Sequence, residues 1–275
     1  MTAPVLPGAE PFSHDPASLE TPATPEKPET RAPSASAGPR VGVLLCHGFT
    51  GSPQSLRPWA EHLAEAGFGV RLPRLPGHGT DWHDMQVTTW DDWYAEVDRA
   101  FHELLAGYDR VFVMGLSMGG TLALRLAERH GADVAGLVLV NASVKPDKAL
   151  IKLVPVLKHL VPSVPGIGGA INKPGVSELA YSRVPLKALA SFTGGWRTVQ
   201  ADLPKVTQPI LLFRSTADPV VHPSNSAVIL SRVSSTDVVE TVLEKSSHVA
   251  TLDHDAEQIH AASVEFVRRV AGLGK

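Results

Sequence analysis

Three residues in this chain could together perform nucleophilic attack on a carbonyl group. Ser117 lies in the sequence Gly-Leu-Ser-Met-Gly, Asp218 precedes a proline, and His248 follows two serines. Serine is a weak nucleophile at neutral pH, so it needs a base beside it, and the base needs a third group that fixes its tautomer and stabilises its charge. Ser117, His248 and Asp218 would supply the nucleophile, the base and the acid.

The segment around Ser117 predicts the geometry that such a nucleophile requires. Residues 110–115 are mostly apolar and predict a strand, and residues 121–129 have apolar side chains at helical spacing. Gly-x-Ser-x-Gly between a strand and a helix is the pattern of a sharp, strained turn. The flanking glycines avoid collisions with neighbouring backbone. The start of the helix also offers N–H groups and partial positive charge to an oxyanion.

Predicted strands and helices alternate along most of the chain. The strands are expected at residues 41–46, 69–73, 110–115, 136–140, 209–214 and 238–243. The helices are expected at residues 53–66, 89–105, 121–129, 225–232 and 253–270. This alternation predicts an α/β fold with a mostly parallel, doubly wound sheet. Ligands bind such sheets at the carboxyl ends of the strands. Since Ser117, Asp218 and His248 all follow strands, we expect them to lie together at the carboxyl ends of the strands, on the same edge of the sheet.

Two segments depart from the alternation. Residues 1–39 are rich in Pro, Ala, Ser, Thr and Glu and lack hydrophobic periodicity, which predicts a disordered tail. Residues 40–275 are then one α/β domain. Within it, residues 144–207 are rich in Pro and Gly but contain apolar clusters at helical spacing. We expect an inserted cap of short helices there, because a structureless loop of that length is improbable in a compact domain.

Composition excludes several classes of function. With 25 basic and 28 acidic residues the net charge is −3, so nucleic acid and anionic membrane surfaces are not expected partners. The single cysteine, Cys46, excludes an internal disulfide and fits a reducing compartment. The N-terminus lacks a signal-peptide pattern and no apolar run is long enough to span a bilayer. We therefore expect a cytoplasmic protein without stable membrane insertion.

Other acidic residues are weaker candidates for the acid than Asp218. Asp253 and Asp255 are expected in the first turn of the last helix. Asp237 precedes a predicted strand and should lie at the opposite edge of the sheet. Asn141, at the end of the fourth predicted strand, cannot carry a charge. Asp218 is therefore the predicted acid.

The segment His47-Gly-Phe-Thr-Gly closes the first predicted strand, beside the turn at Ser117. We expect the backbone N–H groups of Phe49 and Met118 to stabilise the developing oxyanion. Each such donor contributes on the order of 3 kcal/mol in the transition state. His47 is expected to be structural, and His78, between two glycines, to shape its loop.

Neither a metal nor an organic cofactor is expected. The short polar clusters that could be drawn as metal ligands are Asp81, His83 and Asp84, and separately His254 and Asp255. Short polar clusters of this kind mostly lie on solvent-exposed faces and do not bind a metal. The first predicted strand is not followed by the Gly-x-Gly-x-x-Gly pattern of a dinucleotide site.

Taken together, these motifs resemble the α/β-hydrolase superfamily, and more narrowly its bacterial carboxylesterase and monoacylglycerol lipase-like group. The resemblance extends from about Val41 to the C-terminus. It rests on residues 47–51, 75–79, 115–120, 218–221 and 247–253. It implies the α/β-hydrolase fold with a helical cap. The usual first two strands have no predicted counterpart, so we expect a shortened sheet edge.

The resemblance implies a serine carboxylesterase that hydrolyses short- to medium-chain esters through an acyl-enzyme intermediate. The cap, including Trp196, would line an apolar acyl pocket for a small ester substrate. A monoacylglycerol lipase, a cofactor-free C–C bond hydrolase or perhydrolase, and a non-catalytic binding protein remain alternatives. Dehalogenase and epoxide hydrolase chemistry are disfavoured because position 117 is Ser rather than Asp. The sequence leaves the oligomeric state open.

Overall fold

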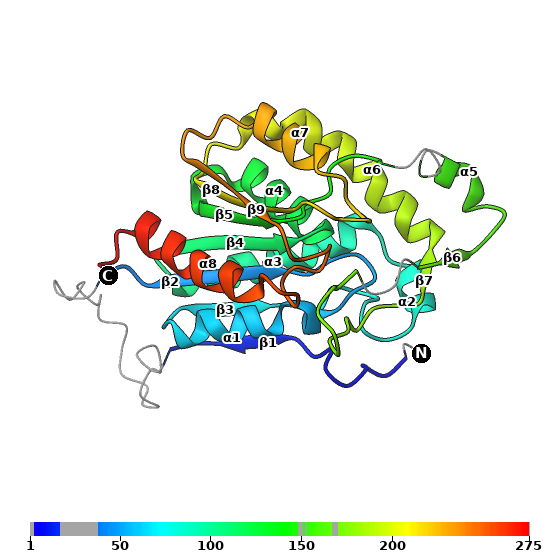
Figure 1. The fold of residues 1–275 in the computed structure, drawn as a ribbon, viewed down its shortest axis with the longest axis horizontal. Coiled ribbons are helices and arrows are strands. Elements are labelled where there is room, and N and C mark those ends of the chain that lie inside the picture. Colours follow the sequence, from blue (N-terminus) through cyan, green and yellow to red (C-terminus); the bar gives the residue numbers. More distant parts are fainter. Residues whose placement is uncertain (1–2, 17–37, 148–150, 152, 167–169, 275) are drawn as a thin grey trace.

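A seven-stranded sheet forms the centre of the molecule in the computed structural model, which describes residues 3–16, 38–147, 151, 153–166 and 170–274 (Figure 1). The strand order is β1-β3-β2-β4-β5-β8-β9, and neighbouring strands are parallel except for the antiparallel edge strand β1. The strands are β1 (Phe12–His14), β2 (Val41–Cys46), β3 (Gly69–Leu72), β4 (Arg110–Leu116), β5 (Val134–Val140), β8 (Ile210–Ser215) and β9 (Val238–Leu243). The predicted doubly wound, mostly parallel sheet is confirmed.

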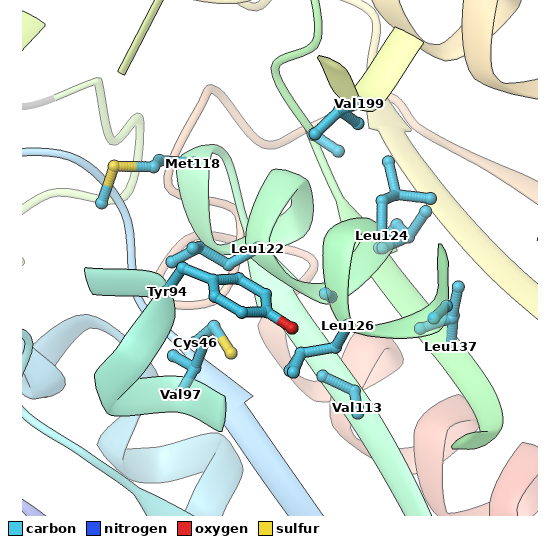
Figure 2. Close-up of a cluster of buried hydrophobic side chains, with 14 of the residues drawn as sticks. Cys46, Tyr94, Val97, Val113, Met118, Leu122, Leu124, Leu126, Leu137 and Val199 are labelled. Atoms are coloured by element: carbon cyan, nitrogen blue, oxygen red, sulfur yellow. The ribbon is translucent and has the colours of Figure 1, made fainter. Parts of the chain in front are cut away.

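Helices cover both faces of this sheet and enclose two cores. One core contains α1 (Arg57–Glu65) and α8 (Ala256–Ala271), and the other contains α3 (Trp90–Gly107) and α4 (Met118–His130). The side chains of the central strands alternate between the two cores, so these strands are apolar along their whole length. Figure 2 shows the second core, in which side chains of β2, β4 and β5 meet those of α3 and α4.

Outside the cap, the remaining helices of the described residues are short. They comprise η2 (Pro53–Leu56), α2 (Trp82–Gln86), η3 (Gly131–Asp133) and α7 (Ser224–Arg232). The predicted helices agree with the observed ones to within a few residues at most ends. Thr89 begins α3 with a capping box, in which its side chain accepts from the N–H of Asp92 and the Asp92 carboxylate accepts from the N–H of Thr89.

The N-terminal segment is not the tail that the sequence predicts. β1 pairs with β3 in the register Phe12 to Leu72 and His14 to Val70, and so extends the sheet by one strand. The Asp15 carboxylate accepts from the Arg71 guanidinium and from the Tyr108 hydroxyl. The prediction of disorder is therefore wrong for residues 3–16, and the sheet edge is less shortened than expected. Residues 1–2 and 17–37 of the predicted tail lie outside the described residues.

The cap differs from the predicted set of short helices. Its elements are α5 (Val154–Leu157), β6 (Ser163–Pro165), β7 (Arg183–Pro185), α6 (Leu186–Asp202) and η5 (Leu203–Lys205). β6 and β7 form a two-stranded antiparallel sheet and α6 has 17 residues, neither of which was expected. In Figure 1, α5, β6, β7 and one end of α6 lie together beyond one end of the parallel strands. The cap therefore covers the carboxyl ends of the parallel strands.

Candidate active site

Ser117 occupies a strained turn between β4 and α4. Its φ of 56° and ψ of −117° lie in a region that a residue with a side chain rarely adopts, and it is 8% exposed. The flanking glycines make this turn possible. A Cβ at Gly115 would overlap the backbone of Gly119, and a Cβ at Gly119 would overlap the carbonyl of Cys46 at the end of β2. The close packing of α4 on two strand ends holds Ser117 in its conformation.

His248 and Asp218 form a buried hydrogen-bonded pair. The His248 Nδ1 lies 2.7 Å from Asp218 Oδ2, and the two side chains are 9% and 1% exposed. The other carboxylate oxygen, Oδ1, accepts from the N–H groups of Val220 and Val221 at 2.8 Å each. Because the carboxylate is fixed on both sides, it holds the proton of the imidazole on Nδ1. This tautomer leaves Nε2 free to accept a proton.

The structure places Ser117 and His248 on the wall of one cavity of about 410 Å³. Among the described residues, the Ser117 hydroxyl makes no hydrogen bond to the His248 ring. Such contacts often shorten only when substrate is bound. The cavity wall is mainly apolar, with side chains from the cap opposite Ser117. These include Leu157, Val184, Leu186, Leu189, Phe192 and Trp196.

The two predicted oxyanion donors lie in this region as well. Met118 is the first residue of α4, and Phe49 follows Gly48, where an added Cβ would lie 3.5 Å from the Ser117 Cβ. In the described part of the chain, neither the N–H of Phe49 nor that of Met118 has a hydrogen-bond acceptor. Both are therefore available to an anion formed at Ser117. The Phe49 ring stacks on Phe192 of α6 with 5.6 Å between centroids, which joins this loop to the cap.

His47 holds the loop that carries Phe49. Its Nε2 accepts from the N–H of Leu75 at 3.2 Å, so its Nδ1–H donates to the carbonyl of Gly48 at 3.0 Å. Burial lowers the pKa of His47 to about 4, which keeps the ring neutral at pH 7 as these two hydrogen bonds require. His78 packs edge-on against it with 5.1 Å between centroids. Both contacts agree with the predicted structural roles.

Two residues that sequence reasoning did not assign to the site position the His248 loop. The Asn141 amide at the end of β5 donates to the carbonyl of His248 at 2.8 Å, and its Oδ1 accepts from the N–H of Ser215 at 2.8 Å. Asp253 is 1% exposed and accepts from the N–H groups of Asn172 in the cap and Ser247 beside the histidine. Their sequence neighbours give no signal, since the contacts of Asn141 with the His248 loop and of Asp253 with Asn172 join residues distant in the chain.

The rival acids have other partners. Asp253 lies before α8 rather than in its first turn, and four backbone N–H groups hold its carboxylate. Asp255, the N-cap of α8, accepts from the N–H groups of Lys245 and Ser246. Asp237 precedes β9 and forms an exposed ion pair with Arg269.

The residues considered as possible metal ligands also have protein partners. Asp81 caps α2 and pairs with the exposed ring of His83. Asp84 accepts from the N–H of Ala3 at 2.9 Å, and the N–H of His254 donates to Asp253. These contacts are those of ordinary loop and helix termini.

Glu178, a cap residue that sequence reasoning missed, also lines the cavity. Its Oε1 lies so close to Gly51 that a Cβ there would be 2.7 Å away. Burial raises the pKa of Glu178, an effect that the charge of His248 opposes. In the described part of the chain, its carboxylate has no hydrogen-bond donor. The segment around it is rich in Pro and Gly and gave no signal.

The fold and this arrangement define a serine hydrolase of the α/β-hydrolase superfamily. The family described as serine aminopeptidase, S33, matches residues 37–255, and the chain belongs to this family. A thermostable monoacylglycerol lipase of Bacillus sp. (strain H-257) is 41% identical over 269 residues, which make up 98% of each chain. A carboxylesterase of Bacillus subtilis (strain 168) is 24% identical over 88% of this chain and 98% of its own.

A solved structure of the metagenome-derived lipolytic enzymes LipS and LipT has the same fold. It superimposes with a TM-score of 0.86 at 37% identity and covers 97% of this chain and 100% of that chain. Together with the family, these similarities establish a serine ester hydrolase. Among the described residues, no helix is both long and apolar enough to cross a membrane.

Proposed function

We propose that this serine ester hydrolase cleaves monoacylglycerols. The observation that carries the proposal is the composition of the cavity at Ser117. Its walls are mainly apolar and suit an acyl chain, whereas Glu178 offers a carboxyl group to which none of the described residues donates a hydrogen bond. The hydroxyls of a glycerol group are donors of the kind that such a carboxylate accepts. The similarity to a monoacylglycerol lipase, at 41% identity, supports a monoacylglycerol substrate over an ester without a glycerol group.

In the proposed mechanism, Ser117 Oγ attacks the ester carbonyl while Nε2 of His248 takes its proton. Asp218, 2.7 Å from Nδ1, stabilises the resulting imidazolium. The N–H groups of Phe49 and Met118 bind the oxyanion of the tetrahedral intermediate. His248 then protonates the departing glycerol oxygen. A water molecule, deprotonated by the same ring, releases the fatty acid from the acyl-enzyme.

The test is a chain-length series of 1-monoacylglycerols beside p-nitrophenyl esters of the same acids. We expect turnover of both series by the wild type and none by Ser117→Ala, which should also fail to react with a fluorophosphonate. Glu178→Gln should raise KM for the glyceryl esters about tenfold, the effect of one weakened charged hydrogen bond, and leave the nitrophenyl esters nearly unchanged. Turnover of nitrophenyl esters without turnover of any monoacylglycerol would contradict the proposal.

A carboxylesterase for short- to medium-chain esters is the second candidate. The volume of about 410 Å³ favours it, because a cavity of this size suits a short acyl chain. The same chain-length series separates the two candidates by the position of its maximum and by the glyceryl preference. We further propose a cytoplasmic location, which is supported by the single, buried Cys46.

A further inference from the structure

Three side chains of types that can bind a metal ion lie close together between α3 and the C-terminal end of α4, away from Ser117. Asp98 and His102 are one turn apart on α3, and His130 is the last residue of α4. One potential ligand atom from each lies within 4.8 Å of the others. The mechanism uses none of them. Because α4 has 13 residues, His130 lies about 20 Å along the helix from Ser117.

Asp98 and His130 already lie within hydrogen-bond distance, whereas the Nδ1 of His102 hydrogen-bonds the backbone carbonyl of Asp98 at 2.8 Å, a contact that an ion would have to displace. Asp98 Oδ1 lies 2.6 Å from His130 Nε2, and the Tyr94 hydroxyl donates to the same oxygen at 2.9 Å. His102 Nδ1 lies 3.6 Å from Asp98 Oδ2, and the two imidazole rings meet edge-on with 5.1 Å between centroids. Tyr94 Oη is also 3.4 Å from His130 Nε2. A small rotation of the side chains would make room for an ion among them.

Some charges around this group favour a bound cation, and others oppose it. The carbonyl end of α4 carries partial negative charge, which favours a cation beside His130. Partial burial raises the pKa of Asp98, but hydrogen bonds from His130 and Tyr94 outweigh it and lower the pKa overall, so the carboxylate stays ionised. Arg129 lies over the Tyr94 ring at 5.0 Å and opposes a cation there. Arg125 is paired with Glu128 and Asp202.

We infer that Asp98, His102 and His130 form a binding site for a divalent transition-metal ion of the zinc class. Two imidazoles and one carboxylate are a donor set that Zn²⁺ accepts at about 2.0–2.2 Å, with water or the Tyr94 hydroxyl as the fourth ligand. The ion takes the place between Asp98 and His130 that a shared hydrogen bond occupies without it. Since the site links two helices far from Ser117, its role is structural.

The test is titration of the EDTA-treated full chain with Zn²⁺ by calorimetry, and with Co²⁺ by visible absorbance. His102→Ala is the main variant because its side chain is 58% exposed, so the chain should fold normally. We expect one ion per wild-type chain at this site, and affinity at least about tenfold weaker in His102→Ala, which lacks one of three protein ligands. The ion should also raise Tm in the wild type more than in the variant.

Two controls separate this site from other histidines. His83→Ala removes a histidine that pairs with an aspartate, Asp81, at a helix end but that, among the residues the structure describes, belongs to no group of three potential ligands. It should leave the affinity unchanged, and so should His248→Ala. Equal Zn²⁺ affinity in the wild type and His102→Ala would overturn the inference and leave a plain ion pair between Asp98 and His130. So would a loss of binding in His83→Ala or His248→Ala.

Discussion

Gly119 determines whether the chain can form the turn at Ser117. A Cβ added there would overlap the carbonyl of Cys46, which belongs to a central strand and cannot move away. We expect Gly119→Ala to lower the free energy of unfolding by about 3 kcal/mol, because a methyl group forced into a packed interior strains the backbone. Urea denaturation followed by circular dichroism measures the change.

Gly194 provides the matched control for this substitution. It lies inside α6, and an added Cβ there would have nothing within 4 Å among the described residues. Gly194→Ala should raise the stability by up to about 1 kcal/mol through helix propensity alone. If Gly119→Ala were as stable as the wild type, the close approach of α4 to β2 would not be what shapes the turn.

Asp218 is the residue whose charge the proposed mechanism needs most directly. Asp218→Asn keeps the shape of the side chain but can favour the wrong tautomer of His248, so kcat should fall about 10⁴-fold. Steady-state kinetics on a nitrophenyl ester would measure this. Asp237→Asn, which removes an exposed carboxylate at the opposite edge of the sheet, should change kcat less than twofold. Equal losses in the two variants would argue against Asp218 as the acid.

The loop that follows β9 owes its position to Asp253. Because this carboxylate accepts N–H groups from the cap and from Ser247, it couples two elements that are far apart in the sequence. Burial raises its pKa, but the backbone hydrogen bonds outweigh that effect and the net pKa lies below its usual range. A carboxylate with a lowered pKa stabilises the folded state when the pH is above its unfolded pKa of about 4.

The stabilisation from Asp253 should therefore be complete at neutral pH and be lost as the pH falls from about 4 through the lower folded pKa. Asp253→Asn removes this dependence, so the stability difference between wild type and variant should be largest near pH 7 and shrink below pH 4. Urea denaturation at a series of pH values measures it. A difference that stays constant over this range would contradict the argument. Activity should fall as well, because the His248 loop is less fixed.

The sequence pattern predicted those elements whose own residues carry the signal, either a long apolar run or a local helix cap. The strands β2, β4, β5 and β8 are apolar on both faces, and α3 carries its own cap at Thr89. By contrast, β1 has three residues and its pairing with β3 leaves no periodic pattern to detect. The strands β6 and β7 could not be predicted for the same reason, since each has only three residues.

The candidate site was predicted to a similar extent and for a similar reason. Ser117 lies in a local motif, and Asp218 and His248 follow strands, so the topology of a parallel sheet brings all three to one edge. Asn141, Asp253 and Glu178 could not be found in this way. Asn141 and Asp253 bind groups from other elements, and Glu178 reaches the cavity from the cap, so only the folded structure brings these residues to the site.

At the scale of the whole molecule, β1 in the described segment 3–16 pairs with an edge of the sheet that would otherwise be open. β3 pairs with β2 on one side and with β1 on the other, so removal of β1 exposes a row of unpaired N–H and C=O groups. It also removes the Asp15 carboxylate from Arg71 and Tyr108. A chain without residues 1–16 should therefore have a Tm lower by several degrees and aggregate more on heating, as calorimetry and light scattering would show.

The same truncation should leave catalysis in the folded molecules unchanged. β1 lies at the sheet edge, separated from β4 and its Ser117 turn by β3 and β2, and none of its residues lines the cavity at Ser117. Titration with a fluorophosphonate counts the competent sites, and kcat per labelled site should match that of the full chain. A lower kcat per site would mean that the N-terminal segment shapes the active site, either through the sheet or through the hydrogen bond from the N–H of Leu6 to the carbonyl of Gly79 in the loop of His78. An unchanged Tm would mean that the pairing of β1 with β3 does not stabilise the folded protein.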